Sequence, residues 1–342
     1  MSTLASVLHA PGSQSPPSAP RILVTGAGGF IGGRVAAAAR AVPGARVVLM
    51  SRRPLPAADP DPAPGDRDGP GDPAVRQVRA DLQDPASLRG ICDGVDIVLH
   101  CAVRIGGPDQ AVRAVNEHGA RALVAEAERS GVARLVQVST ASVYGRGVFR
   151  NAEPAGLPVA PGSETSRSRA AAEQIVLAAG GTVLRPHVVL GAGDRWAVPG
   201  LVRIHRRLAA TVDGWRTRMS VVDVDDLARA VTAVATAPQD TSGVWHPNHP
   251  APVSCADLFT TLTRRLGLPP ATEDIGVEEA RRRLAGDSVS LHHLAMLTTD
   301  HWFASARLWE ETGCPPGRGF ADSLARHAPW YRRHLGLSDP PG

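Results

Sequence analysis

Lysine is absent from this 342-residue sequence, so all 37 residues counted as lysine plus arginine are arginine. Any chemistry that needs a lysine amine is therefore excluded. Cysteine is scarce as well: the four cysteines lie far apart without a C-x-x-C pair, which predicts neither a zinc site nor a disulfide framework. No apolar run is long enough to cross a bilayer, so we expect no membrane partner. Together these features favour a cytoplasmic protein.

The excess of positive charge is modest and dispersed. The formal net charge is +4, but the arginines are scattered rather than gathered into a stripe with interleaved aromatic residues, so no nucleic-acid partner is expected. Residues 1–20 lack the basic start and long apolar core of a secretory signal, and they are predicted to form a disordered leader. Between residues 54 and 73, seven prolines and five aspartates predict a surface loop.

Apolar, β-branched segments alternate with helical segments from Arg21 onward, and two of these helices are predicted at residues 85–91 and 109–130. This pattern is typical of a parallel sheet that is covered on both faces. We predict an α/β fold with a doubly wound parallel sheet of the Rossmann type and a smaller, mostly helical C-terminal region that binds substrate. The predicted nucleotide-binding part covers residues 21–185, with 221–242 returning to it, and the substrate-binding region covers residues 186–220 and 243–338.

The first strand is followed by the glycine-rich segment "TGAGGFIG". Gly26 permits a tight turn, Gly29 lets the backbone approach a pyrophosphate, and Phe30 and Ile31 open a helix whose N-terminal amides favour an anion. A glycine triplet alone is weak evidence, because it also occurs in packing turns. Its place between the first strand and the first helix of a βαβ unit predicts a bound dinucleotide.

The end of the second strand indicates which dinucleotide this is. An acidic residue there would bind a free ribose 2′-hydroxyl, but the sequence has Ser51, Arg52 and Arg53. Guanidinium groups bind a 2′-phosphate, whereas a carboxylate repels it. NADP is therefore favoured over NAD. The alternative is that a general arginine bias placed two arginines in a solvated loop.

Seven motifs, in this order and spacing, resemble those of the extended short-chain dehydrogenase/reductase family, which includes NAD-dependent epimerases, dehydratases and ketone reductases. They are "TGAGGFIG", "ADLQD", "VLHCAV", "VNEHGARALVAEA", "VSTASVYG", "LRPHVVLGAGD" and "VVDVDDLARA". The resemblance implies a homodimer paired through two helices of each subunit. It also implies cofactor contacts by Asp81 and Leu82 at the adenine, Ala102 and Val103 at the ribose and phosphates, and Pro186 and His187 at the nicotinamide.

The catalytic residues depart from the family pattern. The resemblance makes Thr140 the residue that hydrogen-bonds the reacting carbonyl, but the Tyr-x-x-x-Lys pair falls on Thr165 and Arg169, within the predicted helix "SETSRSRAAAEQIV". Threonine is a very weak acid, and arginine stays protonated, so Arg169 is expected to bind cofactor rather than donate a proton. Tyr144 and His187 remain alternative proton donors.

A missing acid affects oxidation more than reduction, because epimerases and dehydratases of this family begin by oxidising an alcohol. The sequence therefore favours an NADPH-dependent ketoreductase acting on an aromatic polyketide-type ketone, with the proton supplied by the substrate or by water. In these features it resembles atypical angucyclinone ketoreductases of the simocyclinone type. The alternatives are a nucleotide-sugar epimerase, dehydratase or reductase, and a cofactor-binding protein without turnover.

Aromatic residues suggest where a flat substrate would bind. All six tryptophans lie at or beyond residue 196, on the predicted substrate side, although each of them alone is as easily a core residue. We predict substrate contacts for Tyr144, Trp196 and Trp215. The carboxylates of Asp223 to Asp226 precede a helix, where helix capping explains them better than a metal, and no metal is predicted.

Overall fold

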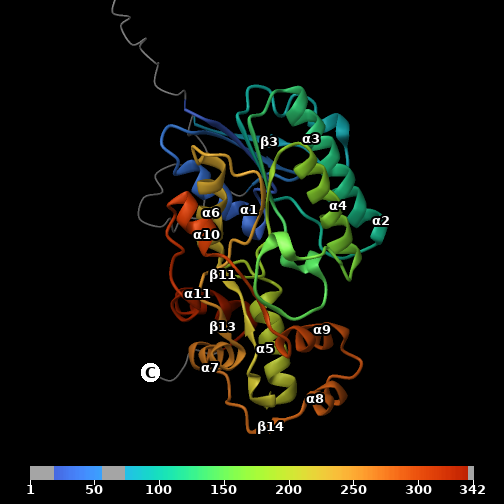
Figure 1. Ribbon diagram of the computed structural model, residues 1–342, viewed down its shortest axis with the longest axis vertical. Coiled ribbons are helices and arrows are strands. Elements are labelled where there is room, and N and C mark those ends of the chain that lie inside the picture. Colours follow the sequence, from blue (N-terminus) through green and yellow to red (C-terminus); the bar gives the residue numbers. More distant parts are fainter. Residues whose placement is uncertain (1–18, 56–73, 338–342) are drawn as a thin grey trace, which may run out of the picture.

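The computed structural model describes residues 19–55 and 74–337 (Figure 1). The predicted leader and almost all of the predicted proline-rich loop lie outside these residues. None of the helices in the described ranges is both long enough and apolar enough to span a membrane.

A seven-stranded parallel sheet forms the centre of the upper part of the molecule in Figure 1. Its order is β12-β7-β5-β4-β1-β2-β3, so the chain starts in the middle and winds outward in both directions. The strands are β1 (Arg21–Thr25), β2 (Arg46–Ser51), β3 (Val75–Arg79), β4 (Ile97–His100), β5 (Arg134–Val138), β7 (Thr182–Leu184) and β12 (Gly243–Trp245). This confirms the predicted doubly wound sheet.

Helices cover both faces of this sheet because its strands are apolar on both sides. Helices α1 (Phe30–Arg40) and α6 (Val224–Thr236) pack together on one face, and α3 (Gly119–Arg129) and α4 (Glu164–Ala178) pack on the other (Figure 1). The helix predicted over 109–130 is present, but a π-helical turn at Ala114–His118 separates α2 (Asp109–Arg113) from α3. The helix predicted over 85–91 is only a short 3-10 turn, Pro85–Leu88.

The C-terminal region has a separate apolar core, below the large sheet in Figure 1. It contains short strands and helices, in agreement with the predicted smaller region. The helices are α5 (Ala197–Leu208), α7 (Cys255–Leu266), α8 (Val277–Arg283), α9 (Ser288–Leu297) and α11 (Phe320–Leu335). The strands are β6 (Phe149–Ala152), β8 (Val188–Leu190), β9 (Ala210–Val212), β10 (Arg218–Met219), β11 (Val221–Asp223), β13 (Val253–Ser254), β14 (Glu273–Ile275) and β15 (His301–Phe303).

Four elements differ from the predicted division of the chain. Strands β6 and β11 pair with β15 and β8 of the C-terminal region, although the sequence assigns them to the nucleotide-binding part. By contrast, β12 completes the large sheet beside β7, and α10 (Ala306–Thr312) packs against α6, where Leu308 and Trp309 join the core of the nucleotide-binding part. The sequence assigns both β12 and α10 to the substrate-binding region 243–338. Their apolar side chains complete the edge and one face of the sheet, a long-range role that local sequence does not reveal.

Candidate functional site

The glycine-rich turn after β1 has the geometry that a dinucleotide requires. Gly26 has a φ of 70°, and a Cβ added there would lie 2.7 Å from Cα of Ala102, at the end of β4. A Cβ on Gly32 would lie 2.1 Å from the carbonyl oxygen of Gly26. The N–H of Gly29 donates to that same oxygen at 2.8 Å. Only glycine fits at the two crowded positions, and the backbone stays open to a pyrophosphate at the start of α1.

The residues predicted to bind the adenosine lie at the ends of β2 and β3. Ser51 is half-buried as the last residue of β2, and Arg52 and Arg53 are exposed directly after it. Asp81 is half-buried, and its Oδ1 accepts the N–H of Gln83 at 3.0 Å. The site therefore presents two guanidinium groups, and no carboxylate, immediately after β2.

Leu82 and the residues after β4 line the next part of the carboxyl edge. Leu82 is buried and packs closely against α3. A Cβ added to Gly119 would lie only 2.5 Å from the Cβ of Leu82. The N–H of Ala102 donates to the Thr25 hydroxyl at 3.3 Å, which joins the end of β4 to the end of β1. Val103 is 39% exposed. Ala102 thus lies against the phosphate turn, while Val103 presents an apolar surface.

Helix α4 places Thr165 and Arg169 one turn apart. A reciprocal pair of hydrogen bonds between Ser163 and Ser166 caps its first turn. The Thr165 hydroxyl accepts the N–H of Gly106 at 3.3 Å. Arg169 donates from Nη2 to the carbonyl oxygen of Val138, the last residue of β5, at 3.0 Å.

Burial lowers the pKa of Arg169 to about 10, and the nearby carboxylate of Glu173 opposes that shift. A pKa at this value leaves the guanidinium charged at neutral pH. Arg169 therefore brings a fixed positive charge to the end of β5, which it can offer to a cofactor ribose or to a developing negative charge.

The end of β5 meets the end of β7 at the expected nicotinamide position. Thr140 follows β5, and its hydroxyl accepts the N–H of Ser142 at 3.2 Å. The N–H of Ala141 donates to the carbonyl oxygen of Pro186 at 2.8 Å, which fixes the two strand ends side by side. Thr140, Pro186 and Arg169 therefore share one stretch of the carboxyl edge.

His187 lies next to Pro186, with its ring among other rings. Its centroid is 5.6 Å from that of His301 and 5.5 Å from that of Phe303, and its Nε2 is buried without a hydrogen-bond partner among the described residues. Burial, with smaller contributions from His301 and His246, lowers the pKa of His187 to about 3. The imidazole is therefore neutral at physiological pH and is not an acid of ordinary strength.

Tyr144 lies in the core of the protein. It is 2% exposed, its hydroxyl is 2.7 Å from Nε2 of His246, and Arg185 donates to it from Nη1 at 2.9 Å. Burial raises the pKa of Tyr144, although the guanidinium of Arg185 opposes the shift. The predicted contact of Tyr144 with substrate therefore needs correction, because a buried phenol with two partners offers no surface to a ligand.

The second tyrosine, Tyr331, is also buried and hydrogen-bonded within the protein. Tyr331 is fully buried, donates to Oδ2 of Asp194 at 3.0 Å, and accepts the N–H of Gly191 at 2.8 Å. Burial raises its pKa, with the Asp194 carboxylate adding to the effect. Since the sequence contains only these two tyrosines, neither phenol is a free proton donor at the carboxyl edge.

The two tryptophans predicted at the substrate have opposite environments. Trp196 is 60% exposed at the start of α5. Trp215 is 3% exposed and stacks on Phe259 with 4.8 Å between centroids, although it also borders a cavity of about 350 Å³ together with Arg216 and Thr217. Trp196 can contact a ligand without rearrangement, whereas most of Trp215 serves the core.

Sequence reasoning missed a buried ionic network behind the site. Glu173 is fully buried and binds Arg185 through several hydrogen bonds, one of them 2.5 Å from Nη2 to Oε2. The Ser139 hydroxyl also donates to Glu173, and Ser139 directly precedes Thr140. Glu173 stands four residues after Arg169 on α4. This helical spacing places the two residues on one face of the helix, but the sequence does not reveal that Glu173 binds Arg185 and Ser139.

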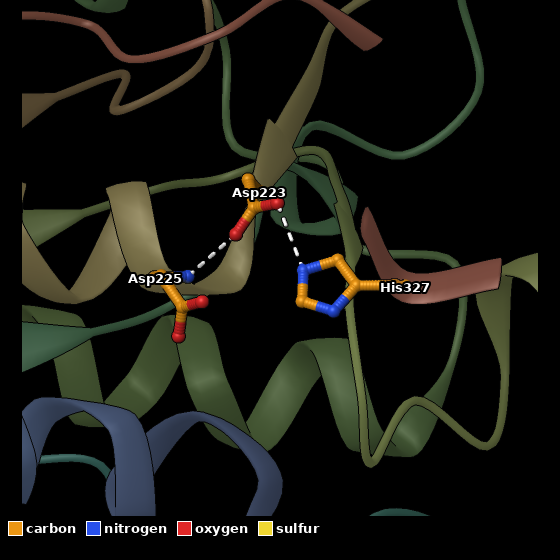
Figure 2. Close-up of side chains that lie close together, drawn as sticks. All are labelled: Asp223, Asp225 and His327. Carbon is orange, nitrogen blue, oxygen red and sulfur yellow. Dashed lines mark hydrogen bonds and ion pairs between the residues drawn. The ribbon is translucent and has the colours of Figure 1, made fainter. Parts of the chain in front are cut away.

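Three ionisable side chains meet near the start of α6, in the arrangement shown in Figure 2. Oδ1 of Asp223 accepts the N–H of Asp225 at 2.8 Å and caps the helix, while its Oδ2 is 3.0 Å from Nε2 of His327. Nδ1 of His327 accepts the N–H of Ala192 at 3.3 Å, and Asp225 pairs with Arg326 at 2.9 Å. Their ligand atoms are engaged by protein groups, which is what helix capping and loop anchoring require.

Comparisons with known proteins match this frame over most of the chain. The chain is 27% identical to the 2-alkyl-3-oxoalkanoate reductase of Stenotrophomonas maltophilia over 90% of this chain and 98% of the relative. It is 29% identical to the dTDP-glucose 4,6-dehydratase of Streptomyces griseus over 93% and 96% of the two chains. It is 28% identical to the 4-hydroxy-2-methyl-3-oxo-4-farnesyl-3,4-dihydroquinoline-1-oxide ketoreductase of Stigmatella aurantiaca over 58% and 63%.

Solved structures share the fold. The UDP-glucuronic acid 4-epimerase of Bacillus cereus, in complex with NAD, superposes with a TM-score of 0.70 at 18% identity, covering 92% of this chain and 99% of its own. The dTDP-glucose 4,6-dehydratase of Streptomyces venezuelae gives 0.67 at 23% identity, over 92% and 98%. The model of the NAD dependent epimerase/dehydratase family matches residues 22–245. The chain therefore belongs to this family of extended short-chain dehydrogenases/reductases.

Proposed function

We propose that the protein is an NADPH-dependent ketoreductase acting on a ketone of an aromatic polyketide-type metabolite, and that the substrate or water supplies the proton. One observation carries this proposal: both tyrosines of the chain are buried in hydrogen-bonded networks, while the cofactor turn is complete. The chain thus keeps the frame for hydride transfer and lacks the usual acid. That combination suits reduction of a ketone that brings its own proton.

The residues at the carboxyl edge fit a dinucleotide that supplies a hydride when bound. The turn at Gly26 would hold the pyrophosphate, since a side chain there would fill the space beside Ala102. Arg52 and Arg53, exposed at the end of β2, would bind a 2′-phosphate and favour NADP. Arg169 would bind the ribose with its permanently charged guanidinium.

Reduction of a ketone can still be catalysed without an acid supplied by the enzyme. General acid catalysis contributes roughly 10²–10⁴-fold, whereas positioning two reactants contributes about 7–11 kcal/mol. Thr140 would orient the carbonyl with its hydroxyl, and Arg169 would offset the negative charge that develops on the carbonyl oxygen. A phenol next to the ketone could then pass its proton to that oxygen, with no enzyme residue changing its protonation state.

Apolar side chains on the loops around the site support an aromatic or otherwise apolar substrate. The large hydrophobic residues that are exposed in the described ranges are mostly on segments that leave the carboxyl ends of β4, β5 and β8: Val103, Ile105, Val148, Val159 and Trp196. Ligands of doubly wound folds bind at this edge. The reductase and ketoreductase names of two relatives also support a ketone substrate.

A nucleotide-sugar substrate is the second candidate, because other similar proteins are dehydratases and epimerases of such sugars. Those reactions require a base to remove a proton from an alcohol. Neither Thr165 nor the charged guanidinium of Arg169 is such a base. A cofactor-binding protein without turnover is the third candidate.

Reaction with labelled cofactor separates the three candidates. We expect deuterium from [4-²H]NADPH to appear in the alcohol formed from aromatic polyketide ketones, detected by mass spectrometry. Ketones with an ortho or peri hydroxyl should react faster than matched ketones without it, and equal rates would exclude proton donation by the substrate. Turnover of a nucleotide sugar without added cofactor would favour the second candidate. Tight NADP binding without any turnover would favour the third.

A further inference from the structure

The loop after β4 is fixed to its neighbours at two points, two residues apart. Oδ1 of Asn116 accepts the N–H of Arg104 at 2.8 Å, and its Nδ2 donates to the carbonyl oxygen of the same residue at 3.0 Å. Nδ2 also donates to the Ser168 hydroxyl on α4 at 3.0 Å. Asn116 is 3% exposed within the π-helical turn, so this first anchor is rigid.

The second anchor is Thr165. Its hydroxyl accepts the N–H of Gly106 at 3.3 Å. Gly106 has a φ of 68° and nothing within 4 Å of where a Cβ would be, so neighbouring side chains do not hold it. Gly107 follows with a φ of 93°. Two consecutive glycines in this conformation leave the loop free to move unless a hydrogen bond restrains it.

Between the two anchors stands Ile105, which is 51% exposed. The loop therefore presents a second apolar side chain two residues after Val103, beyond the carboxyl end of β4. Exposing a branched aliphatic side chain is unfavourable in the free protein, and it is compensated when a ligand covers that side chain. The loop lies beside the first turn of α4, which carries Thr165, and Arg169 stands one turn further along the helix.

We infer that Thr165 is a positioning residue, which holds the Arg104–Gly107 loop so that Ile105 forms an apolar wall against the body of the substrate. In this role the hydroxyl is a hydrogen-bond acceptor, and its proton takes no part in the reaction. The position occupied by a proton donor in relatives has thereby become part of the substrate wall. The substrate part of this inference rests on the proposed ketoreductase function, whereas the anchoring of the loop does not.

Amide exchange in the absence of substrate tests the anchor directly. Thr165→Val keeps the shape of the side chain but removes the acceptor, and it should accelerate hydrogen exchange at the Gly106 amide by about 2- to 10-fold, the value of one modest hydrogen bond. Thr165→Ser should retain slow exchange. The Gly191 amide, bonded to Tyr331, serves as the internal control. Unchanged exchange at Gly106 in Thr165→Val would overturn the inference.

Steady-state kinetics with an aromatic hydroxyketone test the consequence for substrate. Thr165→Val should raise KM about 2- to 10-fold with little change in kcat, because uniform binding is lost. A fall in kcat of about 10²-fold or more, restored by Thr165→Ser, would show that Thr165 donates the proton and would overturn the inference. If the wild-type protein transfers no deuteride to any ketone, the proposed function fails, and the exchange experiment still decides the role of Thr165 as an anchor.

Discussion

Replacing Glu173 with glutamine should cause a large loss of stability. The Glu173 side chain is 0% exposed and that of Arg185 only 4%, so the change leaves a buried guanidinium without its counter-charge. Removal of one partner from such a pair costs about 3–5 kcal/mol. The Ser139 hydroxyl also loses its charged acceptor, so we expect a value in the upper half of that range. Urea unfolding at pH 7, followed by circular dichroism, measures this loss.

The matched control removes both charges. Glu173→Leu combined with Arg185→Met leaves no unpaired ion, so the double variant should recover much of the stability lost in Glu173→Gln. The Tyr144 hydroxyl would lose one of its two partners, which limits the recovery. A loss below about 1 kcal/mol in Glu173→Gln would refute the reasoning, because a pair of so little value behaves like an exposed one.

Three further predictions concern cofactor, substrate and pH. Replacing both Arg52 and Arg53 by alanine should raise the KM for NADPH by roughly 10- to 100-fold and change the KM for NADH far less, because hydrogen bonds to charged groups contribute about 1.5–3 kcal/mol. Equal effects on the two KM values would contradict a contact with the 2′-phosphate. Ile105→Ser should raise the KM for an aromatic ketone by about 3- to 10-fold, because burying such a side chain contributes about 1.5–3 kcal/mol and half of it is already covered. The KM for NADPH serves as the control. Burial lowers the pKa of His100 to about 4 and that of His187 to about 3, so the unfolded chain takes up protons below about pH 6.5 while the folded protein does not. The free energy of unfolding should therefore fall between pH 6.5 and 5 by about 1–2 kcal/mol for each imidazole. A His187→Phe variant that shows the same fall would exclude His187 as a contributor.

The sequence predicts the fold well because its signals are local. Apolar β-branched runs indicate a doubly wound parallel sheet, and the glycine turn after the first strand indicates a bound dinucleotide. The sequence does not predict that β12 belongs to this sheet, because the strand is only three residues long and has no local signal that distinguishes it.

The sequence predicts the parts of the site that a motif builds from backbone atoms. It predicts less well the parts that depend on where a side chain finds its hydrogen-bond partners. The turn at Gly26 lies against Ala102, and Pro186 lies against Ala141 at the end of β5. Tyr144 did not lie at the site, because its hydroxyl is satisfied by Arg185 and His246, which are 41 and 102 residues away in sequence. Such long-range pairs leave no periodic signal, and neither does the bond between Gly106 and Thr165.

The missing phenol has a consequence for specificity as well as for rate. A reductase with its own acid can protonate any ketone that fits the pocket. In this chain Thr165 is bound to the loop, Tyr144 and Tyr331 are buried, and Arg169 keeps its proton, so under the proposed ketone reduction the rate would depend on an acid that the substrate carries or that water provides. Ketones with a neighbouring phenol would then be selected by their own chemistry, in addition to their shape. In that proposal the apolar wall at Ile105 would only have to hold a flat molecule with its phenol beside the reacting carbonyl, and no residue of the enzyme would have to be returned to its starting protonation state before the next turnover.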